Sequence, residues 1–489
     1  MLFNSIDFAI FFPIVFILYW IFSEQLKLRN ILLLIVSYTF YGWWDWRFLF
    51  LIAISSIVDF YVGKELGDTI DNAKRKRLLY LSLLVNLGFL VYFKYTNFFI
   101  DTFVDSFKLF GKTLEVSTLN IILPVGISFY TFQTLSYTID VYKKQLKPSK
   151  DPIAFFAFVS FFPQLVAGPI ERASHLLPQF YKTYKFDYNQ VKSGLLLMAF
   201  GLFKKMVIAD RAALYVNEVY NNPGNYEGVE TIIATVLFAF QIYCDFSGYS
   251  DIAIGASRTM GFDLMKNFDS PYLSKSITEF WRRWHISLST WFRDYVYIPL
   301  GGNRNGKFKT YFNLFIVFVI SGLWHGAAIT FLVWGAIHGF IIVLEKATYK
   351  RKKAIFKLLK INTNSFSNKL LFILVTFSIV CVAWVFFRAN SFLDSKLIIS
   401  SFFNNNLYEL LGDQLYLIGL KENEFSIMIL SIILMILIER SHKKQSFVKV
   451  LSEQSLPFRW SVYVGIVVFI TIFGVYGDSM ASSFIYFQF

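Results

Sequence analysis

The sequence predicts an all-α, polytopic membrane protein, and three observations support that prediction. Of the 489 residues, 56% are hydrophobic and only 16% are charged, whereas a soluble domain carries about 25% charged residues. The mean hydropathy is +0.51, and apolar stretches long enough to cross a bilayer recur along the whole chain. The Lys and Arg residues gather in short loops between these stretches, as the positive-inside rule describes.

The apolar stretches are identified by length, because a helix needs about 17 to 25 residues to cross the hydrocarbon core. In chain order the predicted spans are 5–22, 30–43, 47–63, 79–99, 118–142, 192–212, 230–255, 311–345, 370–388, 425–440 and 460–480. The stretch 311–345 is long enough for two tight helices, so we expect about eleven or twelve crossings. The segment 153–169 is apolar but broken by Pro163 and Gly168-Pro169, which predicts a re-entrant or partly inserted piece shielded by protein.

Loop charge predicts which helix ends face the cytoplasm. The strongly basic loops are 64–77, 143–150, 346–360 and 440–449. These loops should be cytoplasmic, whereas 212–230 holds no Lys or Arg and should be external. No Lys or Arg follows Arg459, and alternation of the spans then predicts that both termini are extracytoplasmic. The first apolar stretch has no basic n-region and no small-residue cleavage site, so we interpret it as a retained span.

Composition and cysteine usage argue against several classes of function. The formal net charge of +14 is carried in loop clusters, so we expect no nucleic-acid partner. Cys244 and Cys381 both lie inside apolar runs, which predicts neither a disulfide framework nor a metal site. No internal repeat is visible, and this disfavours a secondary transporter, because many transporters consist of repeated halves.

The chain has only five histidines, and their positions predict different roles. His442 lies in a basic loop and should be solvated, while His175, in the polar stretch "GPIERASHLLPQF", and His338 are expected to be structural. His325 lies in an apolar hairpin whose two flanks are both basic. An ionisable ring at that depth is costly and predicts function. Burial favours the neutral imidazole, which can accept a proton; an interhelical hydrogen bond is the structural alternative.

The segment "FWRRWHISLSTWFRDYVYIPLGGNRNGKFK" (280–309) combines tryptophans with basic residues. Their helical spacing predicts a helix at the interface, or at the mouth of a cavity on the cytoplasmic side. In the functional interpretation, guanidinium groups bind the phosphates of an anionic cofactor head, with His285 just inside. The residues assigned to that surface are Arg282, Arg283, Trp284 and Arg293. The alternative is a simple amphipathic anchor.

The segment "QIYCDFSGYSDIAIG" (241–255) places Asp245 and Asp251 within a predicted span, with Tyr243 nearby. Carboxylates inside a membrane need partners, and we expect Arg or His on adjacent helices to supply them. The group forms either a contact between helices or a proton relay, and the contact between helices is the favoured interpretation.

Several segments resemble the membrane-bound O-acyltransferase superfamily, in particular its bacterial branch of alginate and peptidoglycan O-acetylation membrane proteins. The matching segments are "FWRRWHISLSTWFRDYVYIPLGGNR", "SGLWHG", "YCDFSGYSDIAIG", "PVGISFYTFQTLSYTIDVY", "FFPQLVAGPIER", the opening "MLFNSIDFAIFFPIVFILYW" and the final "FIYFQF". The resemblance runs from the first residue to the last, and the two histidine motifs together are highly specific.

The resemblance implies a single domain, 1–489, built as a ring of helices with re-entrant or interfacial helices around a central funnel. It implies that His325, in "WHG", is the catalytic base and that His285, in "RWHISLS", is the second catalytic histidine. Acetyl-CoA is then the acyl donor on the cytoplasmic side, with no permanently bound cofactor and no metal. An extracytoplasmic acyltransferase partner, of the SGNH type or similar, would pass the acetyl group to an exported polysaccharide outside the bacterial cytoplasmic membrane.

The final six residues, "FIYFQF" (484–489), are mostly aromatic. A phenol has a pKa near 10, several units below that of an alkyl hydroxyl, so a phenyl ester is the better acyl donor. In the D-alanylation branch of the resembling family, a small separate partner ends in an F-x-Y-x-x-F pattern thought to carry the acyl group. Phe484, Tyr486 and Phe489 match that pattern. We therefore expect Tyr486 to fold back into the external mouth toward His325 and to carry the acetyl group; a packed terminal aromatic cluster is the alternative.

Other functions stay open at this point. A D-alanyltransferase or a lipid acyltransferase of the same superfamily is the nearest enzymatic alternative. A polysaccharide transporter or an assembly subunit without catalysis is the alternative of a different class. The family motifs mark acyl transfer and leave the acceptor open among alginate, peptidoglycan, cellulose, a teichoic acid or another exported glycan.

Overall fold

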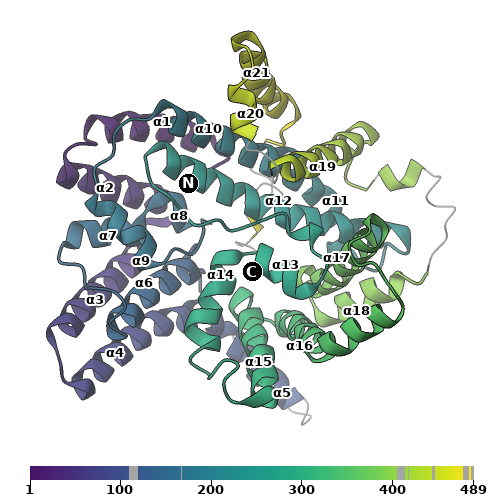
Figure 1. Ribbon diagram of the computed structural model, residues 1–489, viewed down its shortest axis with the longest axis horizontal. Helices are drawn as coiled ribbons and strands as arrows, with labels where there is room; N and C mark the ends of the chain where they lie inside the picture. The colour runs from purple at the N-terminus through teal and green to yellow at the C-terminus, as the bar shows by residue number, and fades with distance from the viewer. Residues whose placement is uncertain are drawn as a thin grey trace. The chain divides into compact units, whose positions relative to one another are not determined.

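The computed structural model describes residues 1–108, 119, 121–166, 168–404, 413–416, 418–442, 447–476 and 484–485. Within these ranges the chain is almost entirely helical and contains no strand (Figure 1), so the predicted all-α class is confirmed. The described helices that are long and apolar enough to cross a membrane are Leu26–Asp68, Asn72–Val104, Val229–Thr259, Ile329–Leu358, Phe366–Arg388 and Leu456–Phe473. The chain is therefore a multi-pass membrane protein. The total of eleven or twelve crossings and the central funnel stay predictions.

The chain folds into two compact units, of which the first comprises 1–198 and 252–265 and the second 199–251 and 266–489. The expectation of one acyltransferase domain concerns function and stays a prediction. The helices of the first unit are α1 (Ile6–Ile21), α2 (Leu26–Asp45), η1 (Trp46–Phe48), α3 (Leu49–Asp68), α4 (Asn72–Leu90), η2 (Val91–Tyr95), α5 (Thr96–Lys108), α6 (Ile127–Tyr142), α7 (Pro152–Ser160), α8 (Phe162–Leu165), α9 (Ala173–Leu176) and η3 (Leu177–Tyr181). Helices α10 (Tyr188–Leu202) and α12 (Val229–Thr259) contribute residues to both units.

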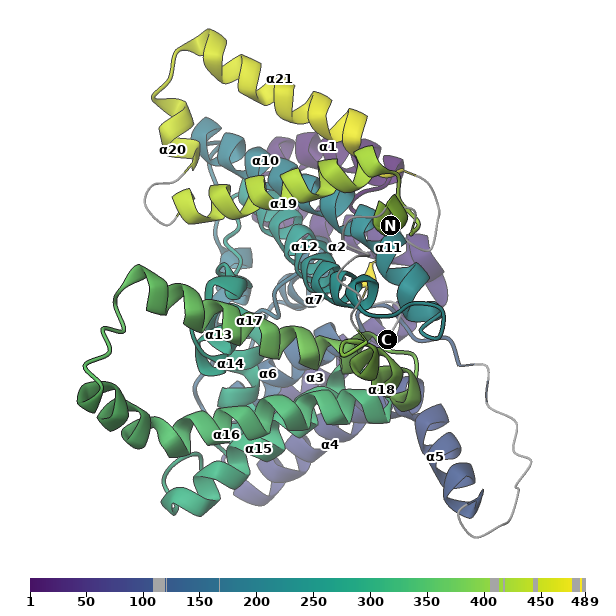
Figure 2. The ribbon, with the colours of Figure 1, turned by 90° about the vertical axis from the view of Figure 1, so that its right-hand side faces the viewer.

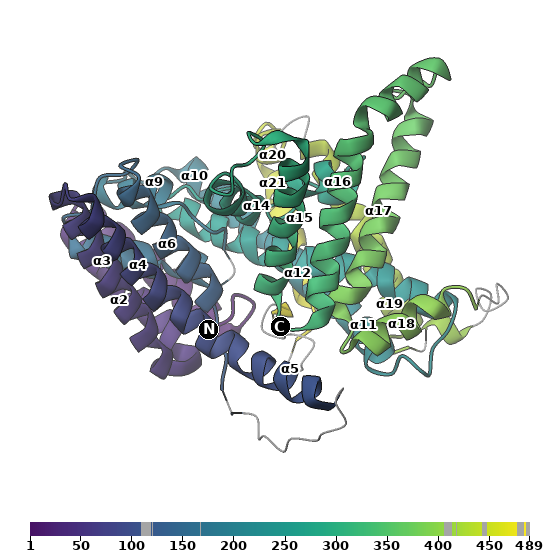
Figure 3. The ribbon, with the colours of Figure 1, turned by 90° about the horizontal axis from the view of Figure 1, so that it is seen from below.

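In the first unit, α3 and α4 lie side by side (Figure 3), and buried polar groups join them to α6. Asp59 accepts hydrogen bonds from Ser82 Oγ, from Asn86 Nδ2 at 2.8 Å and from Thr138 Oγ1 at 3.0 Å. Because these donors are neutral and come from two neighbouring helices, they satisfy the buried carboxylate and hold the three helices together.

Two predictions about this unit have different outcomes. The break predicted in 153–169 is present, because α7 ends at Ser160 and α8, which contains Pro163, has only four residues. The span predicted at 118–142 is wrong in its first part, because the helix begins only at Ile127. Pro124 lacks a backbone N–H, and Gly126 has a left-handed φ of 75°, so the chain turns before α6 begins.

The helices of the second unit are η4 (Phe203–Ala209), α11 (Asp210–Asn221), η5 (Pro271–Leu273), α13 (Ile277–Arg283), α14 (Ile286–Phe292), η6 (Arg293–Tyr297), α15 (Gly306–His325), α16 (Ile329–Leu358), α17 (Phe366–Arg388), α18 (Phe392–Ser401), η8 (Asp413–Tyr416), α19 (Glu422–His442), α20 (Phe447–Ser452) and α21 (Leu456–Phe473). Helices α15 and α16 pack along each other, and α17 follows α16 (Figure 2). The two tight helices expected within 311–345 are therefore present.

Candidate active site

The turn between α15 and α16 places His325 inside the second unit. His325 is the last residue of α15 and is only 2% exposed. Gly322, one turn earlier, lets the two helices approach closely, because a Cβ there would lie 2.3 Å from the carbonyl oxygen of Phe331. The glycine thus allows α16 to cross directly over the turn that carries the histidine.

His285 lies between two short helices in an unusual backbone conformation. Its φ of 44° and ψ of 55° are left-handed, a conformation that costs roughly 1–3 kcal/mol for a residue other than glycine and often occurs at functional sites. A backbone contact holds the next residue, since Ile286 N donates to Asn267 O at 2.9 Å. Glu345 on α16 fixes the start of α13, because it accepts from the backbone N–H groups of Ile277 and Thr278 at 2.8 and 2.9 Å.

Asn267 determines which nitrogen of His285 carries the proton. Its Oδ1 lies 3.0 Å from His285 Nδ1 and also accepts from Ser287 Oγ at 2.8 Å, while its Nδ2 donates to Ser250 Oγ at 3.2 Å. Because an amide oxygen only accepts, Nδ1 is the protonated nitrogen and Nε2 is the basic one. Burial lowers the pKa of His285 to about 3, so the ring is neutral at physiological pH.

The two histidines lie close together although 40 residues separate them in the sequence. Their ring centroids are 6.4 Å apart, and His285 is fully buried. Trp324, Trp334 and Phe387 pack against His325 with centroid distances of 4.8, 5.0 and 5.5 Å. The two imidazoles therefore lie in surroundings of low polarity. Electrostatic interactions are stronger there than in water, and a positioned imidazole can accept a proton.

His338 lies in the same aromatic cluster but has a packing role. Trp281 Nε1 donates to His338 Nδ1 at 3.2 Å, and the ring stacks on Phe280 with an interplanar angle of 7°. The structural interpretation of this histidine agrees with these contacts.

The part of this segment that carries the tryptophans and arginines, 281–293, does not form the single helix that its spacing predicts. It divides into α13, α14 and η6 because the chain turns sharply at His285. Trp281 and Trp284 lie in the core rather than at a surface, at 7% and 0% exposure. Helical spacing fails here because the turn depends on Asn267, which is distant in the sequence.

The predicted phosphate-binding residues are spread over different surroundings. Arg282 is exposed, and Arg293 is exposed beside Asp294, whose Oδ1 lies 2.8 Å from its Nε. Arg283 is partly buried and pairs with Glu279 at 2.6 Å. Trp284 stacks against Phe280 with an interplanar angle of 18°. Of the four, Arg282 and Arg293 present their charge to the surroundings.

The carboxylates of α12 have lysine partners. Asp245 Oδ1 lies 2.8 Å from Lys205 Nζ, and Asp251 Oδ2 lies 2.5 Å from Lys204 Nζ. The prediction of Arg or His partners was wrong. The adjacent lysines in "GLFKKMV" lie inside a predicted span, and that position was a signal that could have identified them.

Tyr243, also on α12, donates a hydrogen bond to Glu439 Oε1 of α19 at 2.6 Å. Sequence reasoning did not find this glutamate, which lies near the end of a predicted span. The pairs on α12 therefore join it to η4 and to α19, in agreement with the favoured interpretation of contacts between helices.

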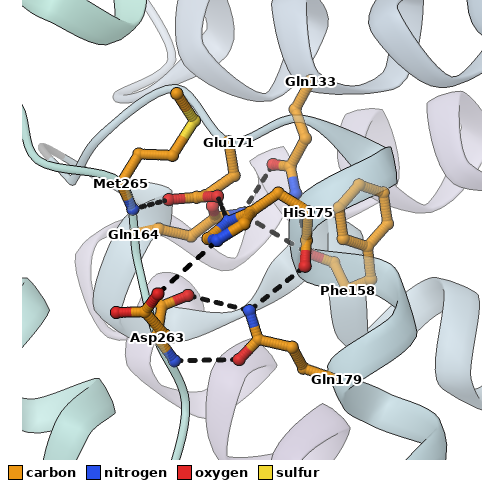
Figure 4. A network of polar contacts seen from close by, with 8 residues as sticks. All are labelled: Gln133, Phe158, Gln164, Glu171, His175, Gln179, Asp263 and Met265. Atoms are coloured by element: carbon orange, nitrogen blue, oxygen red, sulfur yellow. Dashed lines mark hydrogen bonds and ion pairs between the residues drawn. The ribbon is translucent and has the colours of Figure 1, made fainter.

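His175 in the first unit is surrounded by acidic groups (Figure 4). Its Nδ1 lies 2.8 Å from Glu171 Oε2 and its Nε2 lies 3.6 Å from Asp263 Oδ2. Glu171 Oε1 also accepts from the backbone N–H of Met265 at 2.5 Å. The hydrogen bond to Glu171 raises the pKa of His175 above its ordinary value, so this ring favours the charged form and holds the segments 171–175 and 263–265 together.

Two predicted residues lie outside what the structure describes. Tyr486 is not among the described residues, and the side chain of His442 is not described. The two residues before Tyr486 are described: Phe484 and Ile485 are 0% and 1% exposed. Within the described part of the chain, no three or more His, Cys, Asp or Glu side chains are grouped as metal ligands.

The chain matches the sequence profile of the membrane-bound O-acyltransferase family over residues 45–386. It is 42% identical over 394 residues to the "Probable alginate O-acetylase AlgI" of Pseudomonas aeruginosa, covering 80% of this chain and 72% of that protein. It is 36% identical over 422 residues to the "Peptidoglycan O-acetyltransferase" of Helicobacter pylori, covering 80% and 77%. It is 28% identical over 286 residues to the "Teichoic acid D-alanyltransferase" of Bacillus subtilis, covering 56% and 70%. The profile match includes both His285 and His325.

Proposed function

The chain belongs to the membrane-bound O-acyltransferase family, and on that premise we propose that it transfers acetyl from cytoplasmic acetyl-CoA for O-acetylation of an exported polysaccharide. The chain is a membrane-bound O-acyltransferase whose relatives are named for alginate, peptidoglycan and teichoic acid. Polysaccharide O-acylation is common to those names. Acetyl is favoured over D-alanyl because the matches to the O-acetyl-transferring relatives cover 80% of this chain, against 56% for the D-alanyltransferase.

The observation that supports the proposal most directly is the pair of buried histidines, with ring centroids 6.4 Å apart. Acyl transfer to a hydroxyl needs a base that takes the hydroxyl proton and an acid that protonates the leaving group. Neutral imidazole does both in turn, and a positioned proton transfer contributes about 10² to 10⁴ in rate. We assign His325 as the base, with His285 Nε2 as the second basic nitrogen.

In the first proposed step, the phenol oxygen of Tyr486 attacks the thioester carbonyl of acetyl-CoA. The new C–O bond forms as the C–S bond breaks, and His325 takes the phenol proton and returns it to the departing sulfur. The products are acetyl-Tyr486 and free CoA thiol. The position of the preceding residues supports this assignment, because Phe484 packs on Phe246, whose ring lies 4.7 Å from that of His285.

In the second proposed step, a hydroxyl on the extracytoplasmic side attacks the tyrosyl ester. Its proton passes to the phenolate, and Tyr486 is regenerated. An SGNH-type or similar acyltransferase accepts the acetyl group and passes it to the glycan; which glycan stays open among alginate, peptidoglycan, cellulose and teichoic acids. This scheme requires the bacterial cytoplasmic membrane, since acetyl-CoA is cytoplasmic and too highly charged to cross lipid. From the loop charges we propose that both termini lie outside.

We further assign Arg282 and Arg293 to the donor phosphates, because both are exposed and carry permanent charge. Arg283 and Trp284 would support that surface from within, through the pair with Glu279 and through packing on Phe280. A lysine in place of an arginine would keep the charge and lose bidentate binding to phosphate.

The proposal is tested by acetyl transfer from labelled acetyl-CoA in purified protein. The variant His325→Ala should lose about 10² to 10⁴ of the rate, with unchanged expression and thermal midpoint. A transporter or an assembly subunit would instead keep its function without His325. A D-alanyl thioester serves as the competing donor, and a preference for it would replace acetyl with D-alanyl in the proposed function.

A further inference from the structure

The described end of the chain is held inside the second unit. Phe484 and Ile485 are almost fully buried, whereas the last residues of a chain usually fray. The ring of Phe484 lies 4.5 Å from that of Tyr249 and 5.9 Å from that of Phe246, both on α12. The terminal segment therefore packs against the middle of α12.

One carboxylate of α12 binds this segment and a lysine at the same time. Asp245 Oδ2 accepts from the backbone N–H of Ile485 at 2.7 Å, and its Oδ1 lies 2.8 Å from Lys205 Nζ. Lys205 also pairs with Asp210 at 2.8 Å, and all three charged side chains are at most 3% exposed. A buried ion pair is a poor source of stability but fixes geometry, because removing one partner leaves the other charge uncompensated.

The local structure of η4 explains how Lys205 reaches α12. Residues Phe203–Ala209 form a π-helix, and such wide turns occur frequently at functional sites. Gly248 on α12 permits the close approach, because a Cβ there would lie 2.8 Å from Gly201 O and 3.3 Å from Lys205 N. The π-helix also makes a direct contact with the end of the described part of 447–476, since Met206 O accepts from Val475 N at 3.0 Å. Val475 and Ile485 are thus both held through their backbone N–H groups.

We propose that Lys205 and Asp245 are positioning residues that clamp the C-terminal segment beside His285. This inference rests on the proposed function, because it concerns how the residue that follows Ile485 reaches the histidines. The anchor lies at Ile485, the residue that directly precedes Tyr486 in the sequence. The side chain of Phe246 links the anchor to the site, since its ring contacts both Phe484 and His285.

The chain offers a matched control, because a second Lys–Asp pair lies beside the first. Asp251 pairs with Lys204 through Oδ2 at 2.5 Å, and the structure records no contact between Asp251 and the described terminal residues. An amide has one acceptor oxygen where a carboxylate has two. Asp245→Asn therefore loses the contact with either Lys205 Nζ or the Ile485 backbone N–H. Asp251→Asn retains an acceptor oxygen that can bind Lys204 Nζ.

The experiment measures hydrogen exchange at the Ile485 amide in the purified full chain, together with acetyl transfer from labelled acetyl-CoA. Asp245→Asn should raise the Ile485 exchange rate at least tenfold and lower acetyl transfer about tenfold. Asp251→Asn should leave Ile485 exchange within about twofold of wild type. Unchanged exchange in Asp245→Asn, or an equal rise in Asp251→Asn, would overturn the clamp.

Tyr486→Phe separates the clamp from the proposed function. It keeps Phe484, Ile485 and Asp245 and should leave Ile485 exchange unchanged while acetyl transfer is lost. If Tyr486→Phe transfers acetyl at the wild-type rate while Asp245→Asn still frees the Ile485 amide, the acyl-tyrosine step fails and the clamp remains. Thermal midpoints of the three variants show whether each one has folded.

Discussion

His285 and His175 are the same residue type in opposite surroundings, one in each compact unit. His285 is buried beside the neutral amide of Asn267, and burial lowers its pKa to about 3. His175 is 37% exposed beside the carboxylates of Glu171 and Asp263, and the hydrogen bond to Glu171 raises its pKa. A carboxylate favours imidazolium, whereas burial without one favours the neutral ring. The environment therefore favours the neutral ring at His285 and stabilises the charged form at His175.

The largest expected effect comes from exchanging each histidine for alanine. His285→Ala should lower acetyl transfer about 10²-fold, at the low end of what a positioned proton transfer contributes. His175→Ala should leave acetyl transfer within about twofold, because its contacts join segments rather than serve the histidine pair. Initial rates with labelled acetyl-CoA measure both variants. Equal losses in both would show that environment does not separate them.

A smaller effect on acetyl transfer is expected when a carboxylate is placed beside His285, as Glu171 is beside His175. Asn267→Asp places a carboxylate 3.0 Å from Nδ1, which favours the charged ring and raises the pKa of His285. We expect activity to fall below the wild-type value at acidic pH, because a protonated ring cannot accept a proton. Activity should recover as the pH rises through the new pKa, so the acidic limb of the pH–rate profile moves upward.

Asn267→Ala is the control for this shift, since it removes the hydrogen bond without adding charge. Its acidic limb should stay where the wild-type limb lies, with a lower plateau because the ring orientation is lost. An acidic limb that stays at the wild-type position in Asn267→Asp would contradict the electrostatic account of His285.

The local sequence predicted the features that depend on the length of an apolar stretch and on the depth of a residue in the membrane. The α15–α16 hairpin follows from an apolar stretch too long for one span, and His325 was identified because an ionisable residue inside it is costly. The His285 turn was not predictable, because its left-handed backbone depends on Asn267, 18 residues away. The periodicity of the sequence gives no sign that one asparagine contacts a residue so far along the chain.

The sequence predicted that the buried carboxylates of α12 need partners on other helices, but it did not identify those partners. Asp245 and Asp251 were expected to need cations, and each has one. The choice of Lys204 and Lys205 depends on the π-helix that carries them. Hydropathy along the chain reports neither the π-helix nor the close approach of α12 at Gly248.

The smallest expected effect concerns stability and pH at Glu171. The folded-state pKa of His175 is raised, so its contribution to stability is fully present below the unfolded value of about 6.5 and is lost as pH rises through the folded value. Burial also raises the pKa of Glu171, and this shift acts in the same direction, because the folded state again binds more protons. The free energy of unfolding should therefore fall as pH rises.

Glu171→Gln removes the titrating carboxyl group and reduces the upward pKa shift of His175. The free energy of unfolding should therefore depend less on pH in the variant. Because His175 is partly exposed, the effect is about 0.5 kcal/mol, and it appears as a thermal midpoint difference that shrinks between pH 6 and pH 8.5. Acetyl transfer should not change, since the contacts of Glu171 are with His175 and Met265. If the thermal midpoint difference between wild type and Glu171→Gln instead grew with pH, the hydrogen bond to Glu171 would not raise the pKa of His175. The contrast between His285 and His175 would then depend on burial alone.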